Sequence, residues 1–127
     1  MFELGLKDWS IPLIIRVHQI DIDLYVQKMY INYMRYEWNS QKNEWLKNER
    51  NISFEQIIYH LSQGDVWKTS DHPNQREYPG QKIYFVIIED YIYLVPYVTK
   101  ANYHFLKTII PSRKATRIYR EERENEI

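Results

Sequence analysis

The stretch IYFVIIEDYIYLVPYVTKANYHFLKTII, residues 83–110, decides the fold of this 127-residue chain. Three runs in it are rich in the β-branched and aromatic residues that favour strands: 83–88, 91–98 and 103–110. Residues 89–90 and 100–102 separate the runs, and connections this short are typical of hairpins. The sequence therefore predicts an antiparallel meander, with a bulge or a free strand edge at Pro96 because proline cannot donate to a ladder.

Two helical patterns precede the meander. A helix is expected over residues 41–50 behind an asparagine–serine cap, with Trp45 and Leu46 facing the core. Ser53 can cap a second helix, because acidic and amide side chains follow in its first turn and apolar residues recur at helical spacing. We therefore expect two N-terminal helices, introduced by a short strand over residues 36–38.

A long loop and a final helix complete the pattern. Turn-forming residues over 70–82 predict an exposed loop, and Ser112 offers a cap for a helix over 113–124. The order of these elements indicates the α+β class, with an antiparallel sheet, two N-terminal helices and a C-terminal helix.

The composition argues against several kinds of site. The chain has no cysteine and four scattered histidines, which predicts neither a disulfide framework nor a metal site. With three glycines it lacks the loops that hold nucleotide cofactors, and we expect no cofactor. Glu89 and Asp90 interrupt the longest apolar run, which argues against a membrane span. The missing cysteines and the lack of a signal-peptide pattern favour a cytoplasmic protein.

Positive charge gathers towards the C-terminal end, although the formal net charge is zero. Residues 91–120 contain no acidic side chain. The basic residues of this interval are Lys100, Lys107, Arg113, Lys114, Arg117 and Arg120. A local basic surface attracts phosphate even when the whole molecule is neutral, so the interval predicts a phosphate-binding surface.

Two separated motifs resemble the BrnT family of type II toxins. The first is Tyr-Glu-Trp-Asn at 36–39 with Ile-Ser-Phe-Glu at 52–55, and the second is Ile-Ile-Pro-Ser-Arg-Lys-Ala-Thr at 109–116. The family opens with Phe or Tyr, Glu, Trp, and Asp or Asn, continues with Val or Ile, Ser, Phe, Glu, and closes with Ile, Ser, Ala, Arg, Lys, Ala, Thr. The resemblance covers about residues 34–120, with the motifs in the family's order.

The resemblance implies a RelE-like antiparallel sheet with helices, metal-independent cleavage of RNA, and inhibition by a cognate antitoxin. Such an antitoxin also binds operator DNA, so the resemblance implies that this chain associates with the DNA only through the antitoxin. The match begins at Met34, which suggests a toxin domain over residues 34–127 and an upstream extension over 1–33 caused by a misassigned start. The alternative is an extra element that packs on the sheet edge.

Cleavage of RNA without a metal needs a base, an acid and positive charge on the developing phosphorane. Arg113 is the best-placed charge donor, because it stands in the first turn of a helix where backbone N–H groups also point at anions. The predicted catalytic residues are Arg113, Arg117, Lys107, Tyr119, His72 and His104. The predicted RNA-binding residues are Lys114, Arg120 and Lys100. The alternative for His72 is a solvated position in the loop, and the alternative for His104 is a structural role.

A second hypothesis stays open beside the ribonuclease. Arg50 and Thr108 depart from the family pattern, which is compatible with a module of the same fold that binds RNA or a partner protein without cutting. Arg117 and Arg120 also have Glu121 and Glu124 four residues further on, so the last helix can form a solvated, paired face.

Overall fold

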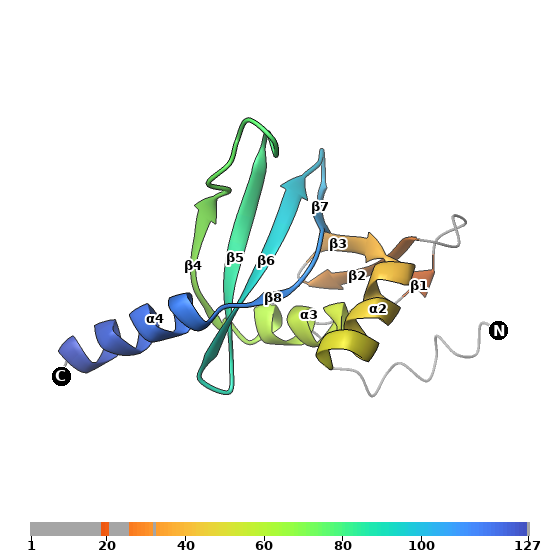
Figure 1. Cartoon of the computed structure of the whole chain (residues 1–127). Helices are drawn as coiled ribbons and strands as arrows, with labels where there is room; N and C mark the ends of the chain where they lie inside the picture. Colours follow the sequence, from red (N-terminus) through yellow and green to blue (C-terminus); the bar gives the residue numbers. More distant parts are fainter. Residues whose placement is uncertain (1–18, 21–25, 32, 127) are drawn as a thin grey trace.

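The computed structural model describes residues 19–20, 26–31 and 33–126 and has the α+β architecture expected from the sequence (Figure 1). Its strands are β1 (Gln19–Ile20), β2 (Val26–Ile31), β3 (Met34–Asn39), β4 (Val66–Asp71), β5 (Gln81–Ile88), β6 (Tyr91–Thr99), β7 (Tyr103–Leu106) and β8 (Ile110–Pro111). Its helices are α2 (Ser40–Arg50), α3 (Phe54–Ser62) and α4 (Arg113–Asn125).

One mixed sheet unites the strands in the order β1-β2-β3-β7-β6-β5-β4, with β8 also paired to β6. The predicted antiparallel meander is confirmed as β5, β6 and β7. Glu89 and Asp90 turn its first hairpin with φ values of 51° and 64°, the left-handed pair that a type I′ turn needs. The expectation of a purely antiparallel sheet is wrong, because β3 runs parallel to β7.

The last predicted strand is shorter than its sequence run. β7 ends at Leu106, and the chain returns to β6 only at Ile110, as the separate strand β8. Between the two strands, the Lys107 N–H donates to the Pro96 carbonyl at 2.8 Å, and the Ile109 side chain is fully buried. The run of strand-forming residues over 103–110 thus contains β7, the buried Ile109 and the start of β8. Local composition does not show where one strand ends and the next begins.

Pro96 lies inside β6 without a bulge of its own. It pairs with Ile83 on β5 in an unbroken register. Its carbonyl accepts from Lys107, and the amide position of a strand residue points to the same side as its carbonyl. The missing donor therefore faces Lys107, between β7 and β8. The expectation of a bulge or a free strand edge is wrong, because β6 is an inner strand and its register at Pro96 is unbroken.

The caps of the helices follow the sequence closely. Asn39 accepts from the Lys42 N–H at 2.9 Å at the start of α2, and Ser53 and Gln56 form a capping box at the start of α3. Leu46 is fully buried as expected, but Trp45 is 43% exposed, so its predicted place in the core is wrong. The buried residues of α2 are Asn43 and Leu46, three positions apart, and Trp45 falls outside this stripe.

The two faces of the sheet carry different helices. On one face, Trp38, Val86, Val95 and Leu106 belong to a core cluster that also contains Leu46 from α2 and Phe54, Ile57 and Ile58 from α3. Ile92 points to the other face, because it lies an odd number of residues from Val95. The Phe85 ring also points to that face, because Phe85 neighbours Val86 on β5. The Trp67 ring contacts both Phe85 and Tyr119 of α4, so α4 packs on the face opposite to α2 and α3.

A hairpin crosses the predicted domain boundary at residue 34. β2 pairs with β3 over its whole length, from Val26 opposite Asn39 to Ile31 opposite Met34. Met29 and Ile31 are each 8% exposed and belong to the core cluster. At least this strand is therefore part of the sheet, and α2 and α3 lie in the middle of the chain rather than at its N-terminal end. Residues 1–18 of the predicted extension lie outside the described residues.

Candidate functional site

The N-terminal half of α4 presents the cations that the sequence singled out. Ser112 Oγ accepts from the Ala115 N–H at 3.0 Å and so fixes where the helix begins. Arg113, Lys114 and Arg117 are exposed, and within the described part of the chain none of their side chains has a hydrogen bond or ion pair. Their charges are therefore available to an external anion.

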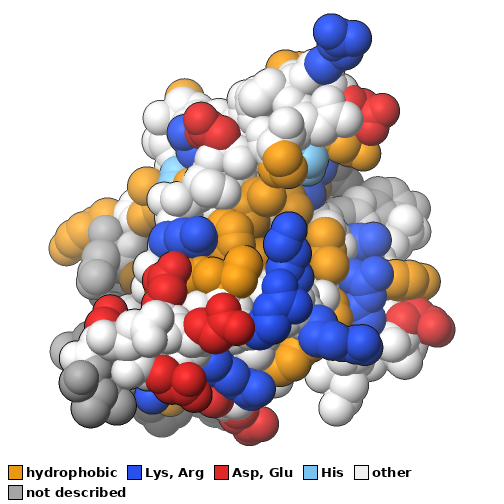
Figure 2. Space-filling model, turned by 60° about the vertical axis from the view of Figure 1, so that its left-hand side comes forward, with side chains coloured by type: hydrophobic (Ala, Val, Ile, Leu, Met, Phe, Trp, Pro, Cys, Tyr) orange, Lys and Arg blue, Asp and Glu red, His pale blue; other side chains and the backbone are white. Residues whose placement is uncertain are grey.

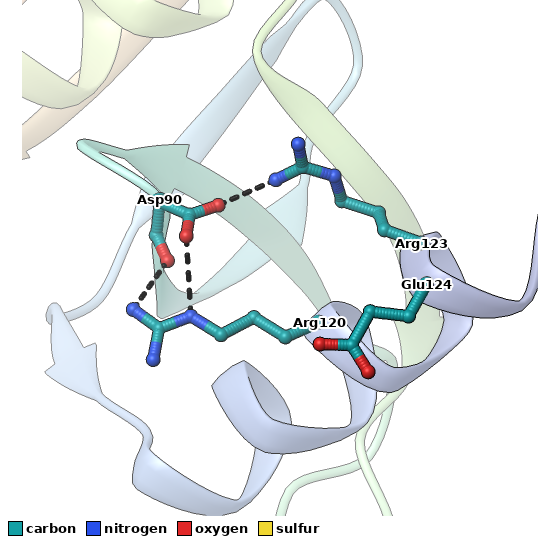
Figure 3. Close-up of a pocket in the computed structure, with 4 residues that line it drawn as sticks. All are labelled: Asp90, Arg120, Arg123 and Glu124. Atoms are coloured by element: carbon teal, nitrogen blue, oxygen red, sulfur yellow. Dashed lines mark hydrogen bonds and ion pairs between the residues drawn. The ribbon is translucent and has the colours of Figure 1, made fainter. Parts of the chain in front are cut away.

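The C-terminal half of α4 is occupied differently (Figure 3). Arg120 Nε lies 3.2 Å from Asp90 Oδ2, and Arg120 Nη2 donates to the Asp90 carbonyl at 3.1 Å. Arg123 Nη1 pairs with the second carboxylate oxygen of Asp90. With Glu124 these residues line an open pocket of about 260 Å³. Because Arg120 and Arg123 both already bind Asp90, the pocket ties the β5–β6 turn to α4, and Arg120 is not a free RNA-binding cation.

Distances along β6 divide the predicted site residues into two groups. Ser112 N–H donates to the Ile92 carbonyl, whereas His104 pairs with Thr99 at the other end of the same strand. At ~3.3 Å per residue these positions are ~23 Å apart, and Lys100 is slightly farther from α4. The predicted catalytic set is therefore not one site: Lys100 and His104 lie at the far end, and Lys107, beside Pro96, lies between the groups.

The loop that contains His72 is shorter and more ordered than the sequence suggests. β4 extends to Asp71 and β5 begins at Gln81, so the loop spans 72–80. His72 N–H donates to the Gln81 carbonyl at 2.9 Å, and His72 Nδ1 accepts from the Asn74 N–H at 3.0 Å. His72 is half-buried rather than fully solvated, and Gln81 pairs with Val98 near the far end of β6. This histidine is therefore also distant from α4.

His104 belongs to an aromatic cluster that the sequence did not predict. Its Nδ1 lies 2.8 Å from the Tyr84 hydroxyl, which is 3.5 Å from the Tyr36 hydroxyl. The Tyr97 ring stacks on Tyr84 with centroids 4.1 Å apart and lies 4.8 Å from the imidazole. Burial lowers the pKa of His104 and raises the pKa of Tyr84 well above its usual value, so both groups are neutral near pH 7.

The hydrogen bond between His104 and Tyr84 favours a structural role for this histidine. Tyr36 and Tyr97 are 8% and 5% exposed and belong to the same core cluster that α2 and α3 cover. The four rings therefore continue the core to the end of the sheet that extends beyond the helices (Figure 1). Only the long-range pairing of β3 with β7 brings Tyr36 opposite His104, and no short-range pattern signals that contact.

The free energy of unfolding should decrease as the pH falls below about 6.5. The pKa of His104 is lower in the folded protein than in the unfolded chain. As the pH falls, the imidazole is therefore protonated more readily in the unfolded chain, and this shifts the equilibrium towards unfolding. Urea unfolding at pH 7.5 and pH 5.0 measures the decrease, and His104→Phe should make it smaller. An equal decrease in wild type and variant would show that the imidazole is not the group responsible.

The described residues carry no further site of a recognised kind. Among them, no group of three or more histidines and carboxylates is placed to hold a metal ion. None of the helices in the described ranges is long and apolar enough to cross a membrane. Comparison with protein-family models, with curated proteins and with solved structures gives no match to this chain.

Proposed function

We propose that the protein is the toxin of a type II toxin–antitoxin pair and cleaves RNA at the N-terminal half of α4. The observation that carries the proposal is the exposed set Arg113, Lys114 and Arg117, which has no acidic partner among the described residues. A few residues further on, Arg120 and Arg123 are both paired with Asp90, so the lack of partners is specific to the first two turns. Three free cations at a helix N-terminus suit a phosphate backbone.

In the proposed mechanism, arginines stabilise negative charge and the histidines take no part in proton transfer. Arg113 and Arg117 can hold the non-bridging oxygens of a phosphorane, because a guanidinium binds phosphate with two parallel hydrogen bonds. His72 and His104 are excluded from this site by their distance along β6. Lys107 is exposed and Tyr119 half-buried, and these two remain the candidates for proton transfer in the proposal.

An antitoxin would inhibit such a protein by covering the same cations. An acidic segment complements the exposed basic turns of α4, and charge complementarity of this kind speeds association and excludes wrong partners. The proposal places both partners in the cytoplasm, where the RNA substrate is, and it involves operator DNA only through the antitoxin.

A binding module without catalysis is the second candidate. His72 and His104 lie at the end of the sheet that is distant from α4, which favours this candidate. The phosphate-binding turns of α4 then lack histidine, the commonest general base. Such a module would hold RNA through the same cations and leave it intact.

Induced expression of the full chain tests the proposal in cells. We expect arrest of growth, loss of intact cellular RNA, and relief of both when the product of an adjacent antitoxin gene is co-expressed. Normal growth with the protein present in soluble form would instead favour the binding module.

A further inference from the structure

A bulge in β4 turns two neighbouring side chains towards one face of the sheet. The pairing of β4 with β5 shifts between Val66 and Lys68, so Trp67 is the extra residue. In a regular strand neighbouring side chains point to opposite faces. Here the Trp67 ring lies 5.8 Å from the Phe85 ring centroid, and Lys68 Nζ lies 5.1 Å from that same centroid. Both side chains therefore share the face on which Phe85 lies.

Trp67 joins this face of the sheet to α4. Its ring centroid lies 5.4 Å from that of Tyr119, with an interplanar angle of 63°. Trp67, Phe85 and Tyr119 are all half-buried, so none of the three residues is fully covered. We call these three rings the aromatic platform. Lys68 is exposed, and its Nζ sits 4.4 Å from the Trp67 ring centroid.

Cations border the aromatic platform. Lys68 lies over Trp67, and the Arg123 guanidinium lies 5.3 Å from the Tyr119 centroid. Towards the N-terminus of α4 come the free cations. Arg113 is ~9 Å along the helix axis from Tyr119 and, six positions away, projects from the other side of the helix, so a strand that contacts both must cross α4. In the opposite direction the helix carries Glu121, Glu122 and Glu124, which repel phosphate. Figure 2, in which the α4 side of the molecule comes forward, shows hydrophobic side chains in the centre with Lys and Arg bordering them.

We propose that the aromatic platform stacks the bases of single-stranded RNA whose backbone runs to the free cations of α4. The inference rests on the proposed function and adds the substrate class, because a duplex hides the faces of its bases. A base that stacks on Trp67 takes the place of the Lys68 ammonium, which can then pair with a phosphate of the same strand. Rings interleaved with cations are how proteins bind single strands without reading their sequence.

Equilibrium binding of a 2′-O-methyl oligoribonucleotide tests the platform without requiring cleavage, since this probe lacks the attacking hydroxyl. We expect Trp67→Ala to raise the Kd roughly ten- to a hundredfold, the loss of about one stacked base, and Trp67→Phe to restore most of the affinity. Trp45→Ala is the matched control, because Trp45 is exposed and also flanked by cations, Lys42 and Arg50, but lies on α2. Its Kd should equal that of the wild type.

Fluorescence provides a second measurement if Trp67→Ala folds poorly. Saturation with the probe should quench the emission of wild type more strongly than that of Trp67→Phe, because stacking quenches an indole. Equal Kd values for wild type and Trp67→Ala, or equal quenching in wild type and Trp67→Phe, would overturn the platform while leaving the proposed function intact. If wild type binds a duplex of the same sequence as tightly as the single strand, stacking is also overturned. Failure of wild type to bind either probe would overturn the proposed function itself.

Discussion

Arg113→Ala is expected to lower the rate of RNA cleavage by on the order of 10²-fold or more, the usual effect of removing one preorganised charge donor from a transition state. Arg113 is exposed in the first turn of α4 and has no partner among the described residues. Its removal should therefore change the free energy of unfolding by no more than about 0.5 kcal/mol. Single-turnover cleavage and a thermal melt of the same preparation separate the two quantities.

Two further variants make the Arg113 result specific. Arg117→Ala, one helical turn away, should lower the rate in the same way but less. Lys100→Ala removes an exposed cation at the β6–β7 turn, ~26 Å along β6 from the start of α4, and should cleave at the wild-type rate. Full cleavage by Arg113→Ala, or equal losses in Arg113→Ala and Lys100→Ala, would contradict the assignment of α4.

Starting the chain at Met34 should abolish cooperative unfolding. The truncation removes β2, leaves β3 without its antiparallel partner and deletes Met29 and Ile31 from the core cluster. Truncating one buried side chain of this size to alanine commonly lowers the free energy of unfolding by about 2–5 kcal/mol. The free energy of unfolding of a whole domain is only about 5–15 kcal/mol. Urea unfolding followed by circular dichroism measures the outcome.

The variant Ile31→Ala tests the same strand without shortening the chain. It should destabilise the fold by about 2–5 kcal/mol while keeping a single unfolding transition. A Met34 start that unfolds cooperatively with wild-type stability would restore the reading of residues 1–33 as an extension outside the domain.

The parts of the fold that the sequence predicted are those set by local chemistry. The caps at Asn39, Ser53 and Ser112 each need only a side-chain oxygen within reach of an amide three residues on, and all three are confirmed. The Glu89–Asp90 turn likewise follows from a two-residue gap between strand runs. The caps and the turn depend only on residues that lie within a few positions of one another in the sequence.

The parts that the sequence missed depend on pairing between distant segments. The parallel contact of β3 with β7 joins residues nearly 70 positions apart, and it places Tyr36 beside His104. The pairing of β2 with β3 was missed because residues 17–24, not 26–31, carry the clearer alternation in the sequence. Trp67 was missed as well, because only the register shift in β4 aims it at Tyr119.

The candidate site shows the same division. The acid-free interval over 91–120 correctly marks where basic residues gather in the sequence, but one strand and one helix then carry them to different places. Arg113, Lys114 and Arg117 stay together because a helix brings residues three and four positions apart onto one side. Lys100 and His104 separate from them because β6 and β7 extend away from α4, and only the sheet register shows this.

Cleavage of a labelled single-stranded RNA by the purified full-length chain, in single turnover and with EDTA present, decides whether the protein is a metal-independent ribonuclease. The proposal predicts that the RNA is cut under these conditions and that Arg113→Ala, at equal folded concentration, leaves it almost intact. RNA that is bound by the wild-type protein and yet stays uncut would contradict the claim, and would identify the cations of α4 as the surface of a binding module.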